Sequence, residues 1–350
     1  MRIGTPEEIL RSSSSFVDDY TLGLQFPACD WAGYFLFAAL SGDGPCEAVN
    51  LGLLIGHMDG RDLRMPEMAG DPRGIVVIRS LIYDGISYRA PDIGSYTRED
   101  LVYSRSGLDV QVADVARIRG TWPTFELYFV DPVHDIVYEL SGRAGCVHWV
   151  PDHVYSNLYS YLVLPDFAFS GIVTVKGVEH HVSGLGGLDH VNGRNVISPS
   201  SPGVGFWHYD PIAWEDGTVS NALYFIGSHG QVIVGTGMTT GHDRGYQPGT
   251  FSIEYLEVAE GAGNSGYVEA GQSVPRVWRG RLDGGRGTLE YVARAVDVVS
   301  PGRSPVTESN AFFEAEGVFR SEGAADRVMR GRGYGEFMGG SLDLSRLVQN

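Results

Sequence analysis

The sequence predicts an all-β protein built from two antiparallel β-barrels in tandem. Apolar and polar residues alternate with a period of two in many segments, as at Tyr291, Ala293 and Ala295, which is the spacing of strands with one buried face. The 48 glycines are spread without a repeating period, which suits short strands and tight turns. No long helical period appears between Val17 and Gly340, so helices are not expected to build the core.

The elements are expected in the following order along the chain. Thr5-Pro6-Glu7-Glu8 predicts a short helix to about Ser12, because threonine can cap the first turn and proline fits the first helical position. A first series of strands is expected at 33–39, 49–57, 75–83, 108–118, 125–130, 135–140 and 172–182. A second series is expected at 222–227, 231–237, 251–258, 276–281, 288–299, 311–319 and 333–338.

A shift in composition divides the two series. Gly, Ser, Asn and Pro gather between residues 183 and 202, which is typical of a connection between domains. We therefore expect one barrel domain in residues 1–190 and a second in residues 191–350, with no sequence repeat joining them. A junction of this kind is a common location for a ligand pocket.

The bulk composition narrows the classes of partner. The formal net charge is −17, from 43 acidic and 26 basic residues, and no basic patch of the kind that nucleic acids require is present. Anionic membrane surfaces are disfavoured for the same reason. We expect a hydrophobic small-molecule substrate, with no nucleic-acid partner and no membrane insertion.

The cysteines and the N-terminus favour a cytoplasmic protein. Cys29, Cys46 and Cys146 are too few and too widely spaced for a disulfide framework or a zinc knuckle, so they are expected to be buried thiols. The first twenty residues lack a basic segment followed by an apolar one, so no secretory signal is expected. The longest apolar run, Trp31 to Leu40, is about half of a membrane span.

The segment from His180 to Asp216 concentrates the side chains that can do chemistry. It contains four histidines, four carboxylates and two tryptophans, a mixture that suits proton transfer beside an apolar ligand. Its glycine run, residues 184–187, is expected to form a sharp turn that aims the following side chains inward. Asp189, His190 and Asn192 are then the candidate catalytic residues, as general acid, its partner and a substrate-oxygen ligand. The alternative is a structural turn with Asp189 capping backbone amides.

A further segment, residues 207–210, supplies candidate substrate-binding residues, among them Trp207, His208 and Tyr209. In the strand Trp207-His208-Tyr209-Asp210, alternation places Trp207 and Tyr209 on one face and His208 and Asp210 on the other. The second face is either another acid–base pair or a solvated surface.

Other candidate substrate-binding residues follow this segment in the sequence. Trp214 and Glu215 lie where a strand meets a turn. Tyr334 and Glu336 share a face of the expected last strand, where Glu336 needs a partner if it is buried.

Several reaction classes lack their motifs. HExxH, CxxC and HxH spacings for a metal are absent, as are GxSxG for a serine hydrolase and a phosphate-binding GxxxxGK[ST]. No helix is expected after the glycine run, so a dinucleotide fingerprint is excluded as well. We therefore expect neither a metal nor a cofactor.

The motif Gly186-Gly187-Leu188-Asp189-His190-Val191-Asn192-Gly193 resembles the signature of the carotenoid 1,2-hydratase (hydroxyneurosporene synthase) superfamily. The closing Gly333 to Glu336 segment is similar to the last strand of that family, and the Gly-Gly-Leu-Asp sequence resembles the Gly-Gly-Met-Asp of lipocalin-like Diels–Alderases. The resemblance implies two lipocalin-like barrel domains. It also implies hydration, dehydration or pericyclic ring closure on an isoprenoid, without a cofactor.

Two departures from the family pattern bear on which of these activities is expected. Leu188 stands where the hydratases tend to have histidine, and Val191 separates His190 from Asn192. The reduced set of acid–base groups favours a cyclase, such as a pericyclase or a dehydratase-coupled cyclase of secondary metabolism. A hydratase that adds water to an isoprenoid C=C bond and a non-catalytic lipocalin-like carrier remain the alternatives.

Overall fold

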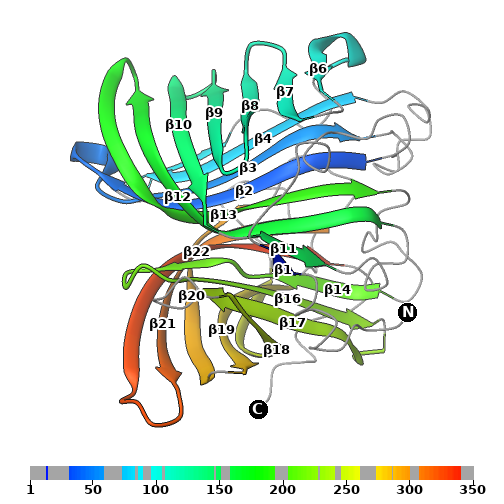
Figure 1. The fold of residues 1–350 in the computed structure, drawn as a ribbon, viewed down its shortest axis with the longest axis vertical. Helices are drawn as coiled ribbons and strands as arrows, with labels where there is room; N and C mark the ends of the chain where they lie inside the picture. Colours follow the sequence, from blue (N-terminus) through cyan, green and yellow to red (C-terminus); the bar gives the residue numbers. More distant parts are fainter. Residues whose placement is uncertain are drawn as a thin grey trace. The chain divides into compact units, whose positions relative to one another are not determined.

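The all-β fold class is confirmed. The computed structural model describes residues 13–14, 31–58, 73–82, 86–89, 96–104, 107–145, 147–150, 158–193, 204–227, 229–240, 246–260, 273–285, 287–299 and 307–339. In these ranges the regular elements are β-strands (Figure 1), apart from two 3-10 turns, η1 (Gly44–Cys46) and η3 (Arg98–Asp100). The described part contains no helix long and apolar enough to cross a membrane. The helix predicted near Thr5 lies outside the described residues.

The strands form two compact units, one with β1 to β13 and one with β14 to β22. The first unit contains β1 (Ser13–Ser14), β2 (Trp31–Gly42), β3 (Val49–Met58), β4 (Arg73–Ile82), β5 (Ile86–Arg89), β6 (Leu101–Tyr103), β7 (Leu108–Val112), β8 (Ala116–Thr121), β9 (Thr124–Asp131), β10 (Ile136–Ala144), β11 (Val147–Val150), β12 (Leu158–Val175) and β13 (Val178–Gly193). β13 extends three residues past the division that we predicted after residue 190.

The second unit has fewer and longer strands. It contains β14 (Val204–Tyr209), β15 (Ile212–Trp214), β16 (Val219–Gly227), β17 (Val232–Thr240), β18 (Tyr246–Glu260), β19 (Ser273–Gly284), β20 (Gly287–Val299), β21 (Thr307–Arg320) and β22 (Arg327–Gly339). All the strand pairings in both units are antiparallel.

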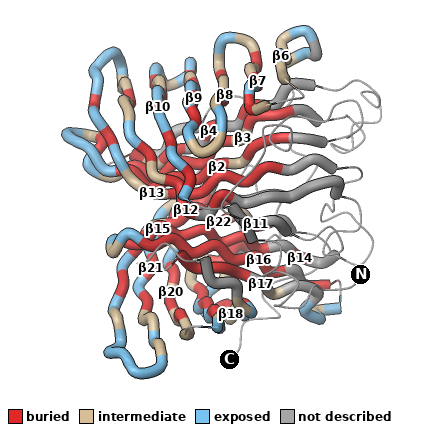
Figure 2. Tube along the Cα trace, viewed as in Figure 1, coloured by how far each residue is buried: buried red, intermediate tan, exposed pale blue. Residues whose placement is uncertain are grey.

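The first unit is a curled sheet with the strand order β5-β4-β3-β2-β13-β12-β10-β9-β8-β7-β6. Its core lies on one face, where alternate residues of each strand are buried. In β2 these are Leu36, Ala38 and Leu40, as period-2 alternation predicts. Figure 2 shows buried residues along the strands and exposed residues at the hairpin turns. Cys46 is buried in this core, as expected, whereas Cys29 and Cys146 lie outside the described residues.

Two predicted strands are each divided by a turn. The predicted strand 172–182 crosses the β12–β13 hairpin, where Lys176 and Gly177 have φ angles of 51° and 78°. Two consecutive positive φ angles are typical of a tight two-residue hairpin turn. The predicted strand 108–118 is divided in the same way between β7 and β8, with Ala113 at a φ of 45°. Continuous alternation across both turns concealed them.

The glycine run at residues 184–187 is not a turn, which corrects the prediction. It lies inside β13, paired with β2 along its length. A Cβ atom on Gly186 would lie 2.0 Å from the Phe37 carbonyl oxygen and 2.9 Å from the Ala38 Cα atom. Glycine is therefore required by the close approach of the β2 backbone rather than by a positive φ angle.

The second unit is a closed barrel. Its nine-stranded sheet runs β14-β16-β15-β22-β21-β20-β19-β18-β17, and the β16–β17 pairing closes it. β14 and β15 both lie between β16 and β22, so together they act as one strand interrupted at Asp210-Pro211. The backbone N–H of Asp210 still donates to the Ala222 carbonyl oxygen at 2.8 Å, which keeps the interrupted segment within the sheet.

Aromatic side chains fill the interior of this barrel. Phe206, Phe251, Trp278, Phe313 and Phe337 are all at most 2% exposed. The rings of Trp278 and Phe313 pack edge to face, with centroids 4.9 Å apart, an arrangement that aromatic pairs favour. The interior of the barrel is therefore lined largely by aromatic side chains.

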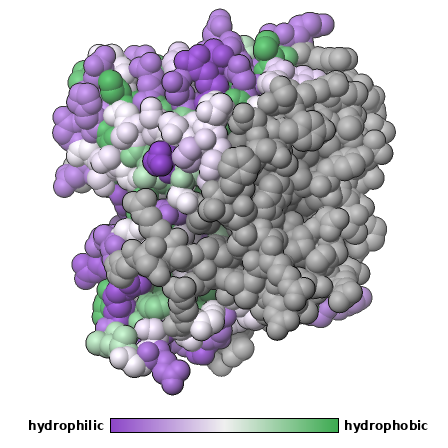
Figure 3. All heavy atoms as spheres, viewed as in Figure 1, coloured by the Kyte–Doolittle hydropathy of each residue, from purple (hydrophilic) through white to green (hydrophobic). Residues whose placement is uncertain are grey.

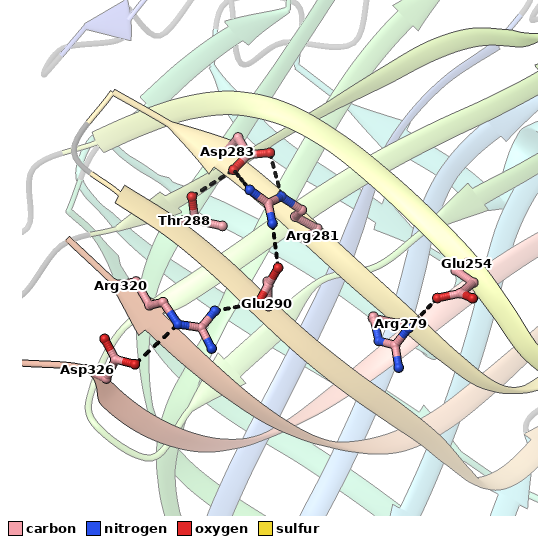
Figure 4. Close-up of polar contacts among 8 residues, drawn as sticks. All are labelled: Glu254, Arg279, Arg281, Asp283, Thr288, Glu290, Arg320 and Asp326. Atoms are coloured by element: carbon pink, nitrogen blue, oxygen red, sulfur yellow. Dashed lines mark hydrogen bonds and ion pairs between the residues drawn. The ribbon is translucent and has the colours of Figure 1, made fainter. Parts of the chain in front are cut away.

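Charged and polar side chains cover much of the described surface that one view shows (Figure 3). In the view of Figure 3 the described surface is mostly hydrophilic, with small separate hydrophobic patches. On the outside of the second barrel, Arg281 bridges Asp283 and Glu290, and Arg320 bridges Glu290 and Asp326 (Figure 4). Exposed ion pairs of this kind contribute little stability individually.

The close approach at Gly186 can be tested by adding a methyl group. We expect Gly186→Ala to lower the free energy of unfolding by about 1–3 kcal/mol, because the new Cβ atom must displace backbone atoms of β2. Gly285→Ala is the control, since a Cβ atom there meets nothing within 4 Å, and its effect should stay within about 0.5 kcal/mol. Urea unfolding of both variants measures the difference. Equal stabilities would contradict the packing argument.

Candidate functional site

His208 and Asp210 lie on the interior face of the second barrel. His208 lies on β14 and Asp210 directly follows that strand. The two residues are two positions apart, so their side chains share a face. Both are 0% exposed. The structure therefore excludes the solvated-surface alternative for this pair, because the face that carries it is the closed inside of the barrel.

The Asp210 carboxylate is held at one oxygen by strands from the other side of the barrel. The indole Nε1–H of Trp278 on β19 donates to Oδ2 at 2.8 Å. The phenol of Tyr291 on β20 donates to the same oxygen at 2.5 Å. Two donors on one oxygen fix the orientation of the carboxylate and stabilise its charge away from water.

His208 is fixed on both sides of its ring. Nδ1 lies 3.1 Å from the Tyr255 hydroxyl, and Nε2 lies 3.4 Å from Asp210 Oδ2. The imidazole packs edge to face against Phe337 and Trp278, with ring centroids 4.8 and 5.4 Å away. The ring is thus held in one position by a polar contact, a charged neighbour and two aromatic walls.

Each member of the pair keeps one buried polar atom unused. Across the described part of the chain, neither Asp210 Oδ1 nor His208 Nε2 has a hydrogen-bond partner. An unsatisfied polar atom in an apolar interior costs stability, so its presence in a native fold calls for an explanation. Proton transfer to a ligand is one, because acid–base chemistry needs an atom that is not already occupied.

The neighbouring tyrosines stay protonated and do not act as bases. Burial raises the pKa of Tyr255 and of Tyr291 well above the ordinary value for a phenol. For Tyr291 the nearby Asp210 charge and its hydrogen bond raise the pKa further. Both phenols therefore stay protonated at neutral pH.

The Asp189–His190 pair is separated by the strand that carries it. Neighbouring residues on β13 point to opposite faces. His190 is 0% exposed on the core face, where it stacks on Tyr34 at 4.4 Å and its Nδ1–H donates to the Gly33 carbonyl at 3.1 Å. Asp189 is 5% exposed on the other face, opposite Phe35. β13 thus places the two side chains on opposite faces, and a catalytic role for either residue stays a prediction.

The predicted substrate-binding residues divide between the two faces of the second barrel. Trp214 lies inside, where its ring packs against Tyr291 with centroids 5.9 Å apart. Tyr209 and Tyr334 are buried on the outward face, and Glu336 is half-buried there.

Three predicted residues need separate mention. Glu215 is exposed, so the structure does not bring it to His208. The side chains of Asn192 and Trp207 lie outside the described part.

Asp210 was not among the predicted catalytic or substrate-binding residues. Tyr255, Trp278 and Tyr291 were not predicted either. The two-residue spacing from His208 was a sufficient signal for Asp210. The other three come from β18, β19 and β20, and only barrel closure brings them to His208 and Asp210. No local motif marks them.

Other features of the described residues do not form a competing site. Within the described ranges, no group of three or more His, Cys, Asp or Glu side chains is arranged to hold a metal ion. A hollow of about 530 Å³ lies on the first unit, lined by charged residues such as Arg117, Arg119 and Glu139. It contains none of the predicted site residues.

The buried phenols predict an alkaline loss of stability. In the unfolded chain a tyrosine ionises near pH 10, while the raised pKa keeps Tyr255 and Tyr291 protonated in the fold. Above pH 10 the folded state then binds more protons, so the free energy of unfolding falls as pH rises, by up to about 1.4 kcal/mol per pH unit for each group. Below pH 10 the contribution is complete.

The double variant Tyr255→Phe/Tyr291→Phe should show a shallower fall, measured by urea unfolding between pH 8 and pH 11. Some slope should remain, because burial also raises the pKa of Tyr34 in the first unit. Tyr128→Phe, at an exposed tyrosine, is the control and should leave the slope unchanged. An unchanged slope in the double variant would show that the two phenols are not protected by the fold.

Comparison with known proteins identifies the fold. No family model matches the chain, and no curated protein matches its sequence. The structure is similar to that of a candidate AttH protein from Nitrosomonas europaea, with a TM-score of 0.62 and 13% identity over 91% of this chain and 97% of that one.

It is also similar to kievitone hydratase from Nectria haematococca, with a TM-score of 0.58 and 11% identity over 94% and 96% of the two chains. Identities this low show a shared fold alone. The resemblance to lipocalin-like hydratases is thus supported at the level of the fold.

Proposed function

We propose that this chain is a hydro-lyase that adds water to, or removes it from, a C=C bond of a hydrophobic isoprenoid or polyketide molecule. His208 and Asp210 carry the proton transfers. The observation that supports this most is a histidine and a carboxylate 3.4 Å apart in an aromatic interior, each with one buried polar atom that makes no hydrogen bond among the described residues.

The geometry assigns one reacting atom to each residue. Trp278 and Tyr291 occupy Asp210 Oδ2, which leaves Oδ1 for the substrate. Tyr255 occupies His208 Nδ1, which leaves Nε2. In the hydration direction one group gives a proton to one alkene carbon, whose π electrons form the new C–H bond. Water oxygen bonds to the other carbon, and the second group takes the proton that this water releases.

The pair can restore itself after each turnover. One group has lost a proton and the other has gained one, so the net transfer of one proton from the second group to the first, relayed by water between Nε2 and Oδ1, returns both to their starting states. The Tyr255 hydroxyl assists, because it can donate to or accept from Nδ1 and so match either tautomer of His208. Dehydration follows the same steps in reverse.

The surroundings suit an apolar substrate that develops positive charge. Trp278 and Phe337 contact His208 edge on, and aromatic faces stabilise cations. The net charge of −17 disfavours an anionic substrate. One of the two fold relatives is, by its name, a hydratase, which agrees with the proposal without establishing it for this chain.

Ring closure is the second candidate, since the aromatic interior that would stabilise a cation would also hold a polyene folded. It was the first choice from the sequence, and it stays a prediction. We rank hydration above it because the proximity of His208 and Asp210 supports a proton-transfer role for this pair. A carrier function would leave that pair without a purpose.

Substitution of Asp210 tests the assignment of the acid–base pair. Asp210→Asn keeps the shape of the side chain but cannot exchange a proton at Oδ1, so kcat should fall by roughly 10²–10⁴-fold. Ligand affinity should change by only a few fold. Asp189→Asn, at a buried aspartate on β13, tests the competing assignment and should keep most of the activity if Asp210 carries the proton transfer. The reverse pattern would move the chemistry to Asp189.

The source of oxygen tests the reaction class. A panel of acyclic prenyl alcohols and prenylated phenols is incubated with the protein in H₂¹⁸O and followed by mass spectrometry. A hydro-lyase adds one ¹⁸O to the product, or loses one water from a hydroxylated substrate. Ring closure with no gain or loss of water would instead establish a cyclase, and unchanged compounds that nevertheless bind would establish a carrier.

A further inference from the structure

The hollow on the first unit is a feature that the proposed reaction does not use. It has a volume of about 530 Å³ and lies over the neighbouring strands β7 to β10 (Figure 1). This volume is within the range of about 300–1,000 Å³ that is usual for small-molecule sites. The residues that line it belong to the first unit and to the described part of the chain. The hollow is therefore complete within one unit.

The polar side chains of the hollow come from the outward face of these strands. Buried and more exposed residues alternate along β9 and β10, so the residues between the buried ones share the outer face. The strand register places Arg117, Tyr128 and Glu139 in one row across β8, β9 and β10. Glu126 and Ser141 lie in the next row. Cross-strand neighbours are close enough for one small ligand to contact both rows.

Two ion pairs hold the arginines of the hollow in place. Arg117 donates from Nε and Nη2 to the Asp109 carboxylate at 3.1–3.2 Å. Arg119 donates from Nε to Glu126 at 2.5 Å. A guanidinium group has five N–H donors, so both arginines still offer N–H groups to a ligand while a carboxylate balances the charge of each.

Tyr128 and Glu139 are the open members of the hollow. Tyr128 is 37% exposed, and it is the one aromatic residue among the large exposed apolar side chains of the described chain. Glu139 is exposed beside it. Because Arg117 is turned toward Asp109, its guanidinium group is held by that carboxylate and not by the Tyr128 ring. The hollow thus presents an aromatic face and a carboxylate side by side.

The charges of the hollow favour a neutral ligand with many hydroxyl groups. An anion would meet the carboxylates of Asp114 and Glu139, and a cation would meet Arg117 and Arg119. A hydroxyl group suits both kinds of neighbour, because it donates to a carboxylate and accepts from a guanidinium group. An apolar ring without hydroxyl groups would cover these charges and leave them unpaired. The Tyr128 ring adds a second requirement, a flat face of C–H groups that can stack on it.

We propose that this hollow is a binding site for a neutral saccharide, with a pyranose ring stacked on Tyr128. A pyranose meets both requirements, because its C–H groups form a flat face and its hydroxyl groups project around the edge. Those hydroxyl groups donate to Glu139 and accept from the free N–H groups of Arg117. The strand face of OB-fold barrels binds oligosaccharides in a comparable way. The site is independent of the proposed reaction, since its residues all belong to the first unit.

NMR titration of the full chain tests the ligand class. The neutral probes are methyl β-D-glucopyranoside, methyl β-D-galactopyranoside, cellobiose and maltose, and at least one should bind with a Kd of about 10 mM or tighter. Sorbitol keeps the hydroxyl groups but lacks the ring, glucuronate adds a negative charge, and protonated glucosamine adds a positive charge. Each of these three should bind at least tenfold more weakly than the best neutral sugar. No saturation with any neutral probe would overturn the proposal, and so would equal or tighter binding of sorbitol or of a charged sugar.

Variants then locate the site. Tyr128→Ala should abolish binding because it removes the stacking surface, whereas Tyr128→Phe keeps the ring and most of the affinity. Glu139→Gln should weaken neutral sugars several-fold and strengthen glucuronate, because a negative charge is lost. Val133→Ala is the matched control, a 66%-exposed residue on the turn between β9 and β10 that does not line the hollow, and it should bind as the unchanged chain does. Full binding in Tyr128→Ala would place the sugar elsewhere and overturn the proposal.

Discussion

The double hydrogen bond to Asp210 Oδ2 is the interaction on which the interior of the second barrel depends. It places a carboxylate among aromatic rings, where an isolated charge would be strongly disfavoured, and it does so with donors from two strands across the barrel. His208 is held beside it by the Tyr255 contact. Removing either donor would leave a buried charge partly uncompensated, so the position of the pair and the closure of the barrel are linked.

The break between β14 and β15 allows this arrangement. Pro211 has no backbone N–H, so the strand is interrupted there, yet the Asp210 backbone remains bonded to Ala222. The interruption lets two short strands fill one position of the barrel while His208 and Asp210 keep the same inward direction. A sequence-local feature thus aims the pair, and long-range pairing supplies its partners.

The fold was largely predictable from the sequence, because strand alternation is a local signal. Alternation also marked the shared face of His208 and Asp210. It failed where it continued through turns, at Lys176-Gly177 and at Ala113. The prediction also failed at Gly186, because the residue type alone does not distinguish a glycine that allows the close approach of a neighbouring backbone from a glycine that forms a turn.

The site was predictable only in part. His208 and Trp214 were predicted and lie inside the barrel, but the preferred pair, Asp189 and His190, is divided by β13 into two faces. That division follows from period 2 once the segment is known to be a strand, so the error came from taking the glycines as a turn. Tyr255 and Tyr291 carry no local signal, because the sheet register alone places them beside His208 and Asp210.

The most direct test of the account is a crystal structure of the chain with a hydrophobic alcohol bound that the protein forms or dehydrates. The account predicts the hydroxyl oxygen or the adjacent carbon within about 3.5 Å of both Asp210 Oδ1 and His208 Nε2, with Oδ2 still bonded to Trp278 and Tyr291. A reacting group bound instead against Asp189 or outside the barrel, with the His208–Asp210 interior unchanged, would contradict it.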